Sequence, residues 1–301
     1  MTTKHLPTIG FVGLGAMGIG MAQSLLRAGF TVKGFDINPA TVQSFGGQGV
    51  SSVAEAAEGV DILILVVVNA GQVEDILFGS GKAVEALPAD SAVMVCSTVK
   101  PDFARQIAQR LYSLGLEMLD APISGGAVKS AAGKLSVMAS GHPAAFDKCQ
   151  PALDPMAENL YRLGDECGLG STVKMINQHL AGVHIAAAAE AIAFGVKAGV
   201  DAQTLYEVIS NSAGSSWMFQ NRVPHMIAGD FTPLSAVEIF VKDLGIVLET
   251  GKEERFPLPL AAAAHQMFLM AAAAGFGRED DSAVVKVFEQ LAGIKVATDS
   301  G

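Results

Sequence analysis

A single lysine, Lys174, opens a segment that is otherwise almost entirely apolar. The stretch GSTVKMINQHL, residues 170–180, continues as AGVHIAAAAEAIAFGVKAGV, where the only charges before Gly199 are Glu190 and Lys197. Since a surface helix alternates polar and apolar faces, this composition predicts a helix buried on nearly all sides. An amine in such a setting can accept and return a proton, which is the chemistry that oxidation of an alcohol needs.

The expected helix gives Lys174 two polar neighbours. Ser171 or Thr172 is a plausible N-cap, which puts Lys174 in the first turn. At about 100° per residue, Asn177 and Gln178 share its stripe of the helix. Burial and the positive end of the helix dipole both favour the neutral amine. The alternative is a structural lysine whose tip extends to solvent at the helix start.

A glycine-rich loop near the N-terminus has the spacing of a dinucleotide site. The segment IGFVGLGAMG contains the G-x-G-x-x-G pattern between an expected strand and an expected helix. Such a loop makes a tight turn, lets the backbone approach a pyrophosphate and points a helix N-terminus at the phosphates. The candidate cofactor-binding residues of this loop are Gly13, Leu14, Gly15, Ala16, Met17 and Gly18.

Asp36 distinguishes between the two nicotinamide cofactors. It ends the second expected strand, at the distance from the glycine loop that this type of site requires. Its carboxylate can accept hydrogen bonds from an adenosine ribose but would repel a 2′-phosphate. Ile37 and Asn38 follow it, with no arginine to bind that phosphate. The sequence therefore predicts NAD rather than NADP, against the alternative of a glycine-rich turn beside a surface aspartate.

Later strand ends should line the same crevice, because ligands of such sheets bind at the carboxyl ends of the strands. Val67 and Val68 are expected to pack on the adenosine or its ribose, with Val73 in the following segment as a further candidate. Thr98 is expected to meet the nicotinamide ribose. Considered singly, each is equally well explained by ordinary packing at a strand end.

The motif DAPISGGAVKSAAGKL, residues 120–135, follows another expected strand. Ser124, Gly125 and Gly126 offer a hydroxyl and unobstructed backbone N–H groups, which suit a carboxylate. By itself the triplet describes only a flexible turn. Beside a dinucleotide site it becomes a candidate anchor for an acidic substrate.

The elements that must position these residues are of the α/β class. Continuous apolar runs alternate with helical ones through the first 120 residues, which predicts a doubly wound parallel sheet covered on both faces. A further strand, KLSVMAS, and the helix after Pro143 should complete this domain. We expect a Rossmann-type NAD-binding domain over residues 1–165. Residues 166–301 are expected to form an all-α domain for substrate binding and oligomerisation, opened by a long interdomain helix.

The amino-acid composition and net charge limit the kinds of molecule that the protein is expected to bind. Of the 301 residues, 50% are hydrophobic and 17% charged, and the net charge is −10. This charge argues against nucleic acid or an anionic membrane as the main partner. Cys96, Cys149 and Cys167 form no close pair, and the short polar N-terminus is not a signal peptide. A cytoplasmic protein with reduced thiols is expected.

Several other features of the sequence have ordinary packing as an alternative explanation. The apolar tract over residues 256–277 has nearly the length of a membrane span, but its prolines and alanines favour a core helix. Trp217, the only tryptophan, could wall a substrate pocket or pack in the core. Asp281 and Ser282 are expected to cap the last helix. The histidines, cysteines and carboxylates show no metal-ligand spacing, so no metal is predicted.

Four motifs in order, GFVGLGAMG, DAPISGGAVKSAAGKL, GLGSTVKMINQ and the late FVKDLG with GREDDSAVVKVFE, resemble those of the β-hydroxyacid dehydrogenase family. The resemblance spans nearly the whole chain. It implies that Lys174 is the catalytic lysine, that Ser124, Gly125 and Gly126 hold the substrate carboxylate, and that Lys242 extends toward the cofactor. Gln178 stands where a substrate-binding asparagine is usual in the family.

The resemblance also implies a substrate and an assembly. The runs GVHIAAAAEA, SAGSSWMFQNR and FPLPLAAAAHQMF are most similar to the branch of the family that oxidises L-threonate. The expected reaction is NAD-dependent oxidation of this hydroxy acid to its 2-oxo acid by a homodimer or homotetramer. Alternatives are oxidation of 3-hydroxyisobutyrate, reduction of tartronate or succinic semialdehyde, and, from another class, a non-catalytic NAD-binding sensor. The presence of the lysine disfavours the related imine reductases.

Overall fold

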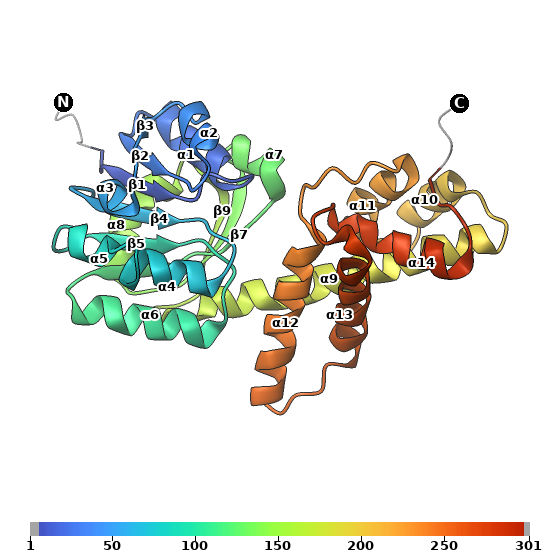
Figure 1. Ribbon diagram of the computed structural model, residues 1–301. Coiled ribbons are helices and arrows are strands. Elements are labelled where there is room, and N and C mark those ends of the chain that lie inside the picture. Colours follow the sequence, from blue (N-terminus) through green and yellow to red (C-terminus); the bar gives the residue numbers. More distant parts are fainter. Residues whose placement is uncertain (1–5, 298–301) are drawn as a thin grey trace. The chain divides into compact units, whose positions relative to one another are not determined.

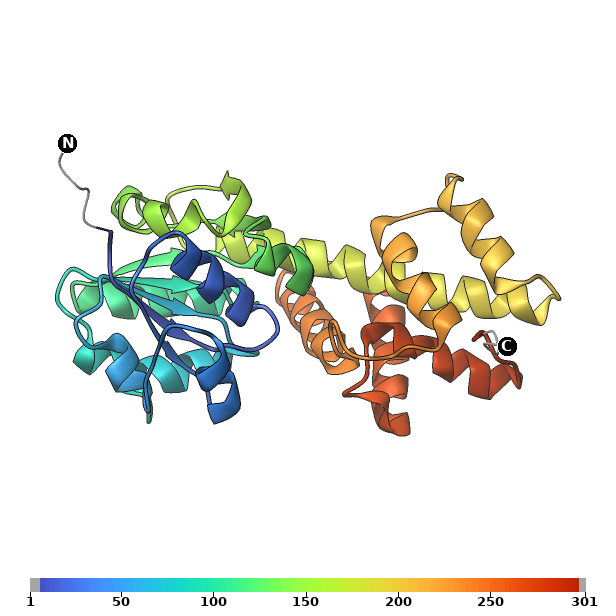
Figure 2. The same cartoon turned by 90° about the horizontal axis from the view of Figure 1, so that it is seen from above.

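The computed structural model describes residues 6–297, which pack as two compact units that divide between Lys174 and Met175. The division falls inside helix α9 (Leu169–Lys197), which Figure 2 shows as one uninterrupted helix. The predicted domain boundary between residues 165 and 166 stays a prediction.

The first unit is built on a six-stranded parallel sheet with the strand order β3-β2-β1-β4-β5-β6 (Figure 1). The order reverses at β1, next to β4, and this reversal creates the crevice in which such sheets bind ligands. The predicted doubly wound fold is confirmed. The strands are β1 (Ile9–Val12), β2 (Val32–Phe35), β3 (Gln48–Gly49), β4 (Ile62–Leu65), β5 (Ala92–Val95) and β6 (Glu117–Asp120).

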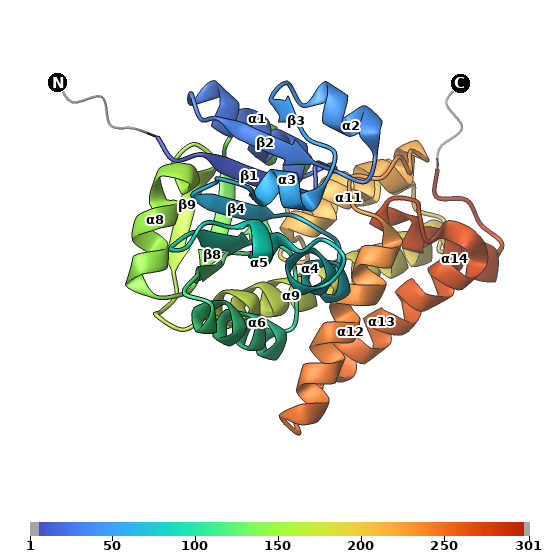
Figure 3. The same ribbon diagram turned by 60° about the vertical axis from the view of Figure 1, so that its left-hand side comes forward.

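Both faces of this sheet are buried, because successive side chains of a strand point to opposite sides. In β4, Ile62 and Ile64 join one core while Leu63 and Leu65 join the other. Helices α1 (Gly18–Arg27) and α8 (Pro143–Leu153) contribute to the first core. The second core is covered by α3 (Val53–Ala57), α4 (Ala70–Phe78), α5 (Ala83–Ala86) and α6 (Pro101–Ser113), as can be followed in Figure 3. A short helix, α2 (Pro39–Ser44), follows β2.

A second, three-stranded sheet completes the unit. It contains β7 (Ile123–Ser124), β8 (Leu135–Ala139) and β9 (Ala157–Arg162), with α7 (Gly126–Ala131) between the first two. Strand β8 is the predicted KLSVMAS strand. An antiparallel bridge between Asp120 and Ser140 joins the end of β6 to the end of β8. The sequence did not predict β9, since AENLYR is mostly exposed and has no apolar alternation.

The second unit is helical, as predicted. After α9 come α10 (Ala202–Ser210), α11 (Trp217–Ala228), α12 (Val237–Glu253), α13 (Pro259–Ala271), a π-helical turn (Ala272–Phe276), a 3₁₀ turn (Asp281–Val284) and α14 (Val285–Ala292). Its core includes Ile192 of α9 and the stacked rings of Phe240 and Phe268. Helix α13 buries one face of its alanine-rich tract in this core.

Helix α9 is not buried on all sides, so that prediction was wrong. Ile176 is 49% exposed, Leu180 52% and Phe194 73%, while the opposite side buries Ile185 and Ala189 completely. Helix α9 and the run Pro259–Phe276 are both long and apolar enough to cross a membrane by length and composition alone. Helix α9 therefore has two apolar faces. One packs in the core of the second unit, and the other is exposed, so its apolar residues are not explained by that core.

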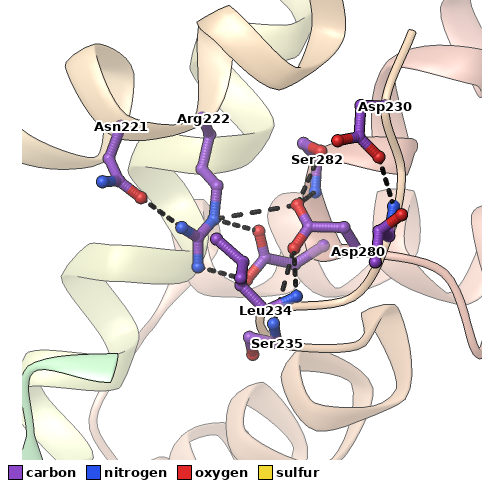
Figure 4. Close-up of polar contacts among 9 residues, drawn as sticks. Asn221, Arg222, Asp230, Leu234, Ser235, Asp280 and Ser282 are labelled. Atoms are coloured by element: carbon purple, nitrogen blue, oxygen red, sulfur yellow. Dashed lines mark hydrogen bonds and ion pairs between the residues drawn. The ribbon is translucent and has the colours of Figure 1, made fainter. Parts of the chain in front are cut away.

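A buried ion cluster ties the second unit together (Figure 4). The guanidinium of Arg222, on α11, donates to both carboxylate oxygens of Asp281, at 2.5 and 3.1 Å. The neighbouring Asp280 accepts hydrogen bonds from the backbone of Leu234 and from Ser282. Asp280 and Asp281 are fully buried. The expectation that Asp281 and Ser282 cap the last helix is wrong: the N-cap of α14 is Val284, the Asp281 carboxylate binds Arg222, and Asp280 accepts the N–H and the hydroxyl of Ser282.

Candidate active site

The glycine loop after β1 has the shape that its sequence predicts. Gly13 has φ +96°, and its N–H donates to the Phe35 carbonyl at the end of β2. A Cβ on Gly18 would lie 1.9 Å from the Gly13 carbonyl oxygen, so the first turn of α1 can pack on the loop only without a side chain there. A Cβ on Gly15 would point into open space. That space is where a bound pyrophosphate would approach the backbone.

Asp36 fixes this loop from the end of β2. One of its carboxylate oxygens accepts the N–H of Leu14 at 2.7 Å, and the other accepts the N–H of Asn38 at 2.8 Å. Each carboxylate oxygen has two lone pairs, so both can still accept a ribose hydroxyl. The half-buried carboxylate and the open backbone at Gly15 fit a dinucleotide.

The other residues predicted to bind the cofactor differ in their exposure to solvent. Ala16 is exposed and Met17 half-buried in the loop, and Ile37 is 87% exposed beside Asp36. Val67 and Val68 follow β4 and are accessible, and the N–H of Val67 donates to Ser97 Oγ at 2.9 Å. Thr98 is half-buried after β5. Val73 lies fully buried in the second core of the unit, so its contact with the cofactor stays a prediction.

The predicted carboxylate anchor lies where β7 passes into α7. Ser124 ends β7, and Gly125 and Gly126 follow with φ values of +138° and +73°. A Cβ on Gly125 would lie 2.9 Å from Lys129 Cβ, in a backbone conformation that already excludes most side chains. Ser124 and Gly125 are half-buried and Gly126 is exposed. Their role as substrate anchor stays a prediction.

Helix α9 is capped by a carboxylate from a distant strand. Asp120, the last residue of β6, is fully buried and accepts the backbone N–H groups of Gly168 and Ser171, each at 2.9 Å, and the Ser171 hydroxyl at 2.7 Å. Ser140 Oγ accepts the N–H of Gly170 at 2.9 Å. These groups satisfy the otherwise unpaired N–H groups of the helix start.

This arrangement corrects the expected cap. The helix begins at Leu169, so neither Ser171 nor Thr172 is the N-cap and Lys174 lies in the second turn. The helix dipole therefore acts on the lysine less than expected, because its effect falls off within the first turn. This role of Asp120 was not predicted from the sequence, where it is named only as the first residue of the motif DAPISGGAVKSAAGKL. Burial raises the pKa of its carboxyl, while the hydrogen bonds from Ser171, Gly168 and Ser140 act in the opposite direction.

Lys174 itself is 7% exposed, and Gln178, one turn further along α9, is 9% exposed. Asn177 is half-buried between them in sequence. A buried lysine is rare, because its charged form loses its hydration. The burial that the sequence predicted for Lys174 is thus present, although the outer side of the helix is open.

Within the second unit, Gln178 and Lys242 meet at one carboxylate. Gln178 Nε2 donates to Asp243 Oδ2 at 2.6 Å, and Lys242 Nζ lies 2.6 Å from Asp243 Oδ1. Asn177 Nδ2 donates to Gln178 Oε1 at 3.1 Å. Asp243 was missed in the sequence, where only its position after Lys242 could have pointed to it.

Trp217 begins α11 and is 62% exposed, which rules out the alternative that it packs in the core. Its contact with substrate stays a prediction. Within residues 6–297, no three His, Cys, Asp or Glu side chains are grouped so that they could hold a metal ion.

A parallel sheet with this strand order, a glycine loop after β1 and an acidic residue at the end of β2 are the features of a Rossmann-type dinucleotide-binding domain. Residues 8–164 match the NAD binding domain of 6-phosphogluconate dehydrogenase, and residues 168–288 match the NAD-binding domain of NADP-dependent 3-hydroxyisobutyrate dehydrogenase. The chain belongs to the β-hydroxyacid dehydrogenase family related to 3-hydroxyisobutyrate dehydrogenase, as its motifs predicted.

Its relatives are similar over nearly their whole length. L-threonate dehydrogenase of Cupriavidus necator is 55% identical over 93% of this chain and 95% of its own. 3-Hydroxyisobutyrate dehydrogenase of Pseudomonas aeruginosa is 34% identical over 93% and 98%. A crystal structure described as 3-hydroxyisobutyrate dehydrogenase from Salmonella typhimurium is 52% identical, covers 93% of this chain and 99% of that one, and has a TM-score of 0.89. The chain is thus a hydroxyacid dehydrogenase with a nicotinamide dinucleotide cofactor.

Proposed function

We propose that the protein oxidises L-threonate to its 2-oxo acid with NAD, and that Lys174 accepts the hydroxyl proton. The observation that carries the mechanism is the burial of Lys174 on the helix that Asp120 fixes to the end of β6. The substrate is supported by the 55% identity with the Cupriavidus necator L-threonate dehydrogenase over 93% of the chain.

In this mechanism the chain binds, orients and deprotonates the substrate. Ser124 Oγ and the backbone N–H groups of Gly125 and Gly126 hold its carboxylate. Lys174, as the neutral amine, takes the proton of the hydroxyl group that is oxidised, and Asn177 or Gln178 orients that hydroxyl. The glycine loop and Asp36 would hold NAD, which would supply the hydride acceptor for the same carbon. The hydroxyl proton goes to Lys174, and the hydride takes its electron pair to the nicotinamide. The overall reaction therefore releases the 2-oxo acid, NADH and one proton.

The substrate is tested by following NADH absorbance with purified four-carbon and three-carbon hydroxy acids. We expect the highest kcat/KM with L-threonate. A higher value for 3-hydroxyisobutyrate would replace this proposal with the second candidate, which the relative from Pseudomonas aeruginosa favours. Absence of turnover over the whole panel, with NAD binding intact, would favour a non-catalytic NAD-binding sensor.

The preference for NAD is attributed to Asp36, with Ile37 and Asn38 beside it. We expect Asp36→Ala to raise KM for NAD by about 10- to 100-fold, because the adenosine ribose loses a charged acceptor. The ratio of kcat/KM for NAD to that for NADP should fall with it. The matched control is Asn38→Ala, which removes the cap of α2 but leaves the carboxylate. A wild-type preference for NADP would refute this role of Asp36.

The protein is further proposed to be a cytoplasmic homodimer or homotetramer. At about 100° per residue, Ile176, Leu180, Ala187 and Phe194 lie along one line of α9, and all four are exposed. An exposed apolar stripe of this length favours contact with a second copy of the chain over permanent exposure to water.

The double substitution Leu180→Glu with Phe194→Glu should shift the protein to a smaller species, because it places charges in the proposed contact. The measurement is sedimentation velocity at several concentrations. Leu114→Glu, which charges an apolar residue of similar exposure after α6, is the control and should leave the species unchanged. A monomeric wild-type protein would contradict the proposed assembly.

A further inference from the structure

A buried carboxylate, Asp243, contacts two residues with separate predicted roles, Gln178 in substrate binding and Lys242 in contact with the cofactor. It lies on α12 with only 2% of its surface exposed. Gln178 Nε2 donates to its Oδ2 and Lys242 Nζ lies beside its Oδ1, both at 2.6 Å. A carboxylate so deeply buried must be paired, since an unpaired charge would lose its hydration without compensation. Asp243 therefore depends on both neighbours, and each of them is held by it.

The Gln178 amide has only one orientation that satisfies these contacts. A carboxylate can only accept hydrogen bonds, so the Gln178 nitrogen must face Asp243. The Gln178 oxygen then faces Asn177, whose Nδ2 donates to it at 3.1 Å. Rotating the amide by 180° would put oxygen against oxygen at Asp243 and nitrogen against nitrogen at Asn177. Asp243 thus determines which atoms of Gln178 face which direction.

The contact with Lys242 is unusual for neighbours in sequence. Adjacent residues on a helix point about 100° apart and do not normally interact. Lys242 must therefore turn its ammonium back toward Asp243, and its side chain is only 22% exposed. The charge of Asp243 thus favours the side-chain conformation in which the ammonium lies beside it.

We propose that Asp243 is a positioning residue for the dehydrogenase reaction, which holds the Gln178 amide and the Lys242 ammonium in the orientation used by substrate and cofactor. This proposal rests on the proposed function, in which Gln178 belongs to the site, and on the predicted reach of Lys242 toward the cofactor. It requires a carboxylate, because one oxygen accepts the Gln178 amide while the charge on the other faces the Lys242 ammonium. It also requires the full length of glutamine, because asparagine at position 178 is one methylene shorter.

Three variants test this contact with the hydroxy acid for which the wild-type enzyme has the highest kcat/KM. Asp243→Asn keeps the shape and an acceptor for the Gln178 amide but removes the charge that faces Lys242. Gln178→Asn shortens the amide side chain. The double variant Asp243→Glu with Gln178→Asn moves the methylene from one partner to the other and restores their combined length. The control for folding is Asp201→Ala, which removes the side chain that caps α10 within the same unit.

We expect each single variant, Asp243→Asn and Gln178→Asn, to lower kcat/KM for the acid by about 10- to 100-fold, as loss of a charge-assisted hydrogen bond does. The double variant should recover at least about tenfold over Gln178→Asn. Asp201→Ala should lower the melting temperature, because α10 loses its N-cap, while leaving kcat/KM unchanged. A purely structural role for Asp243 would instead lower the melting temperature and leave kcat and KM of the folded fraction unchanged.

Two results would overturn the proposal. One is an Asp243→Asn enzyme with kcat/KM within about twofold of the wild type. The other is a folded double variant that is no better than Gln178→Asn. Neither depends on L-threonate being the substrate, because the comparison uses whichever hydroxy acid the wild type turns over best. Preference for another acid would refute the proposed substrate while the same pattern among variants would support the role of Asp243.

Discussion

Lys174→Ala should bind NAD as the wild type does and lower kcat by about 10²- to 10⁴-fold, the range that a positioned general base contributes. The reason is that the variant has no group to take the hydroxyl proton as hydride leaves the carbon. The measurement is steady-state oxidation of the best hydroxy acid, together with fluorescence titration of NADH. Added primary amines of small size should restore part of the rate, because they can enter the space that the side chain vacates.

Two controls separate proton transfer from charge and packing. Lys174→Arg keeps a cation that does not lose its proton near neutral pH, so it should be as inactive as the alanine variant. Lys197→Ala removes a lysine from the last turn of the same helix, where Nζ donates to the Ala292 carbonyl at 2.8 Å, and should leave kcat unchanged. Near-normal turnover of Lys174→Ala with NAD bound would refute the proposed proton acceptor.

Arg222→Met should destabilise the protein by about 3–5 kcal/mol, the usual cost of removing one partner from a buried ion pair. The change leaves the fully buried Asp281 without the guanidinium that donates to both of its oxygens. Urea unfolding measures this loss. Lys286→Met is the control, since its ion pair with Glu279 is partly exposed and should contribute no more than about 1 kcal/mol.

The cost of Arg222→Met should depend on pH. Burial raises the pKa of Asp281 from 3.8 to about 6, and the hydrogen bond and charge of Arg222 oppose that rise. A folded pKa above the unfolded value means that stability from this group is present below about pH 3.8 and is lost as pH rises through the folded pKa. Without Arg222 the pKa rises further. The variant should therefore lose more stability relative to wild type at pH 8 than at pH 5, and an equal loss at both would contradict this account.

The parts of the site that lie close together in sequence were predictable. The glycine loop and Asp36 follow consecutive strands, and the apolar runs of those strands determine that both lie at one edge of the sheet. Gly18 could be read correctly because its reason is local: a side chain there would collide with Gly13. The burial of Lys174 was predictable because the residues on either side of it in the sequence are apolar.

The parts that depend on distant contacts were not predictable. Asp120 caps α9 across 51 residues of sequence to Ser171, and Asp243 holds Gln178 across 65. No periodicity or propensity connects such pairs, so the local serine and threonine suggested a cap that the helix does not use. The exposed side of α9 was missed for a related reason. An apolar composition does not say whether the neighbour that covers a face is the same chain or another one.

The anchoring of α9 by Asp120 also sets the rotational phase of the helix. Once the N–H groups of Gly168 and Ser171 are fixed, each later residue has an assigned direction, and Lys174 follows Ser171 by three residues. Deleting one residue between them would turn Lys174, Asn177 and Gln178 together by about 100° without altering any of their side chains. The segment should therefore accept many substitutions of its outward residues, but no insertion or deletion.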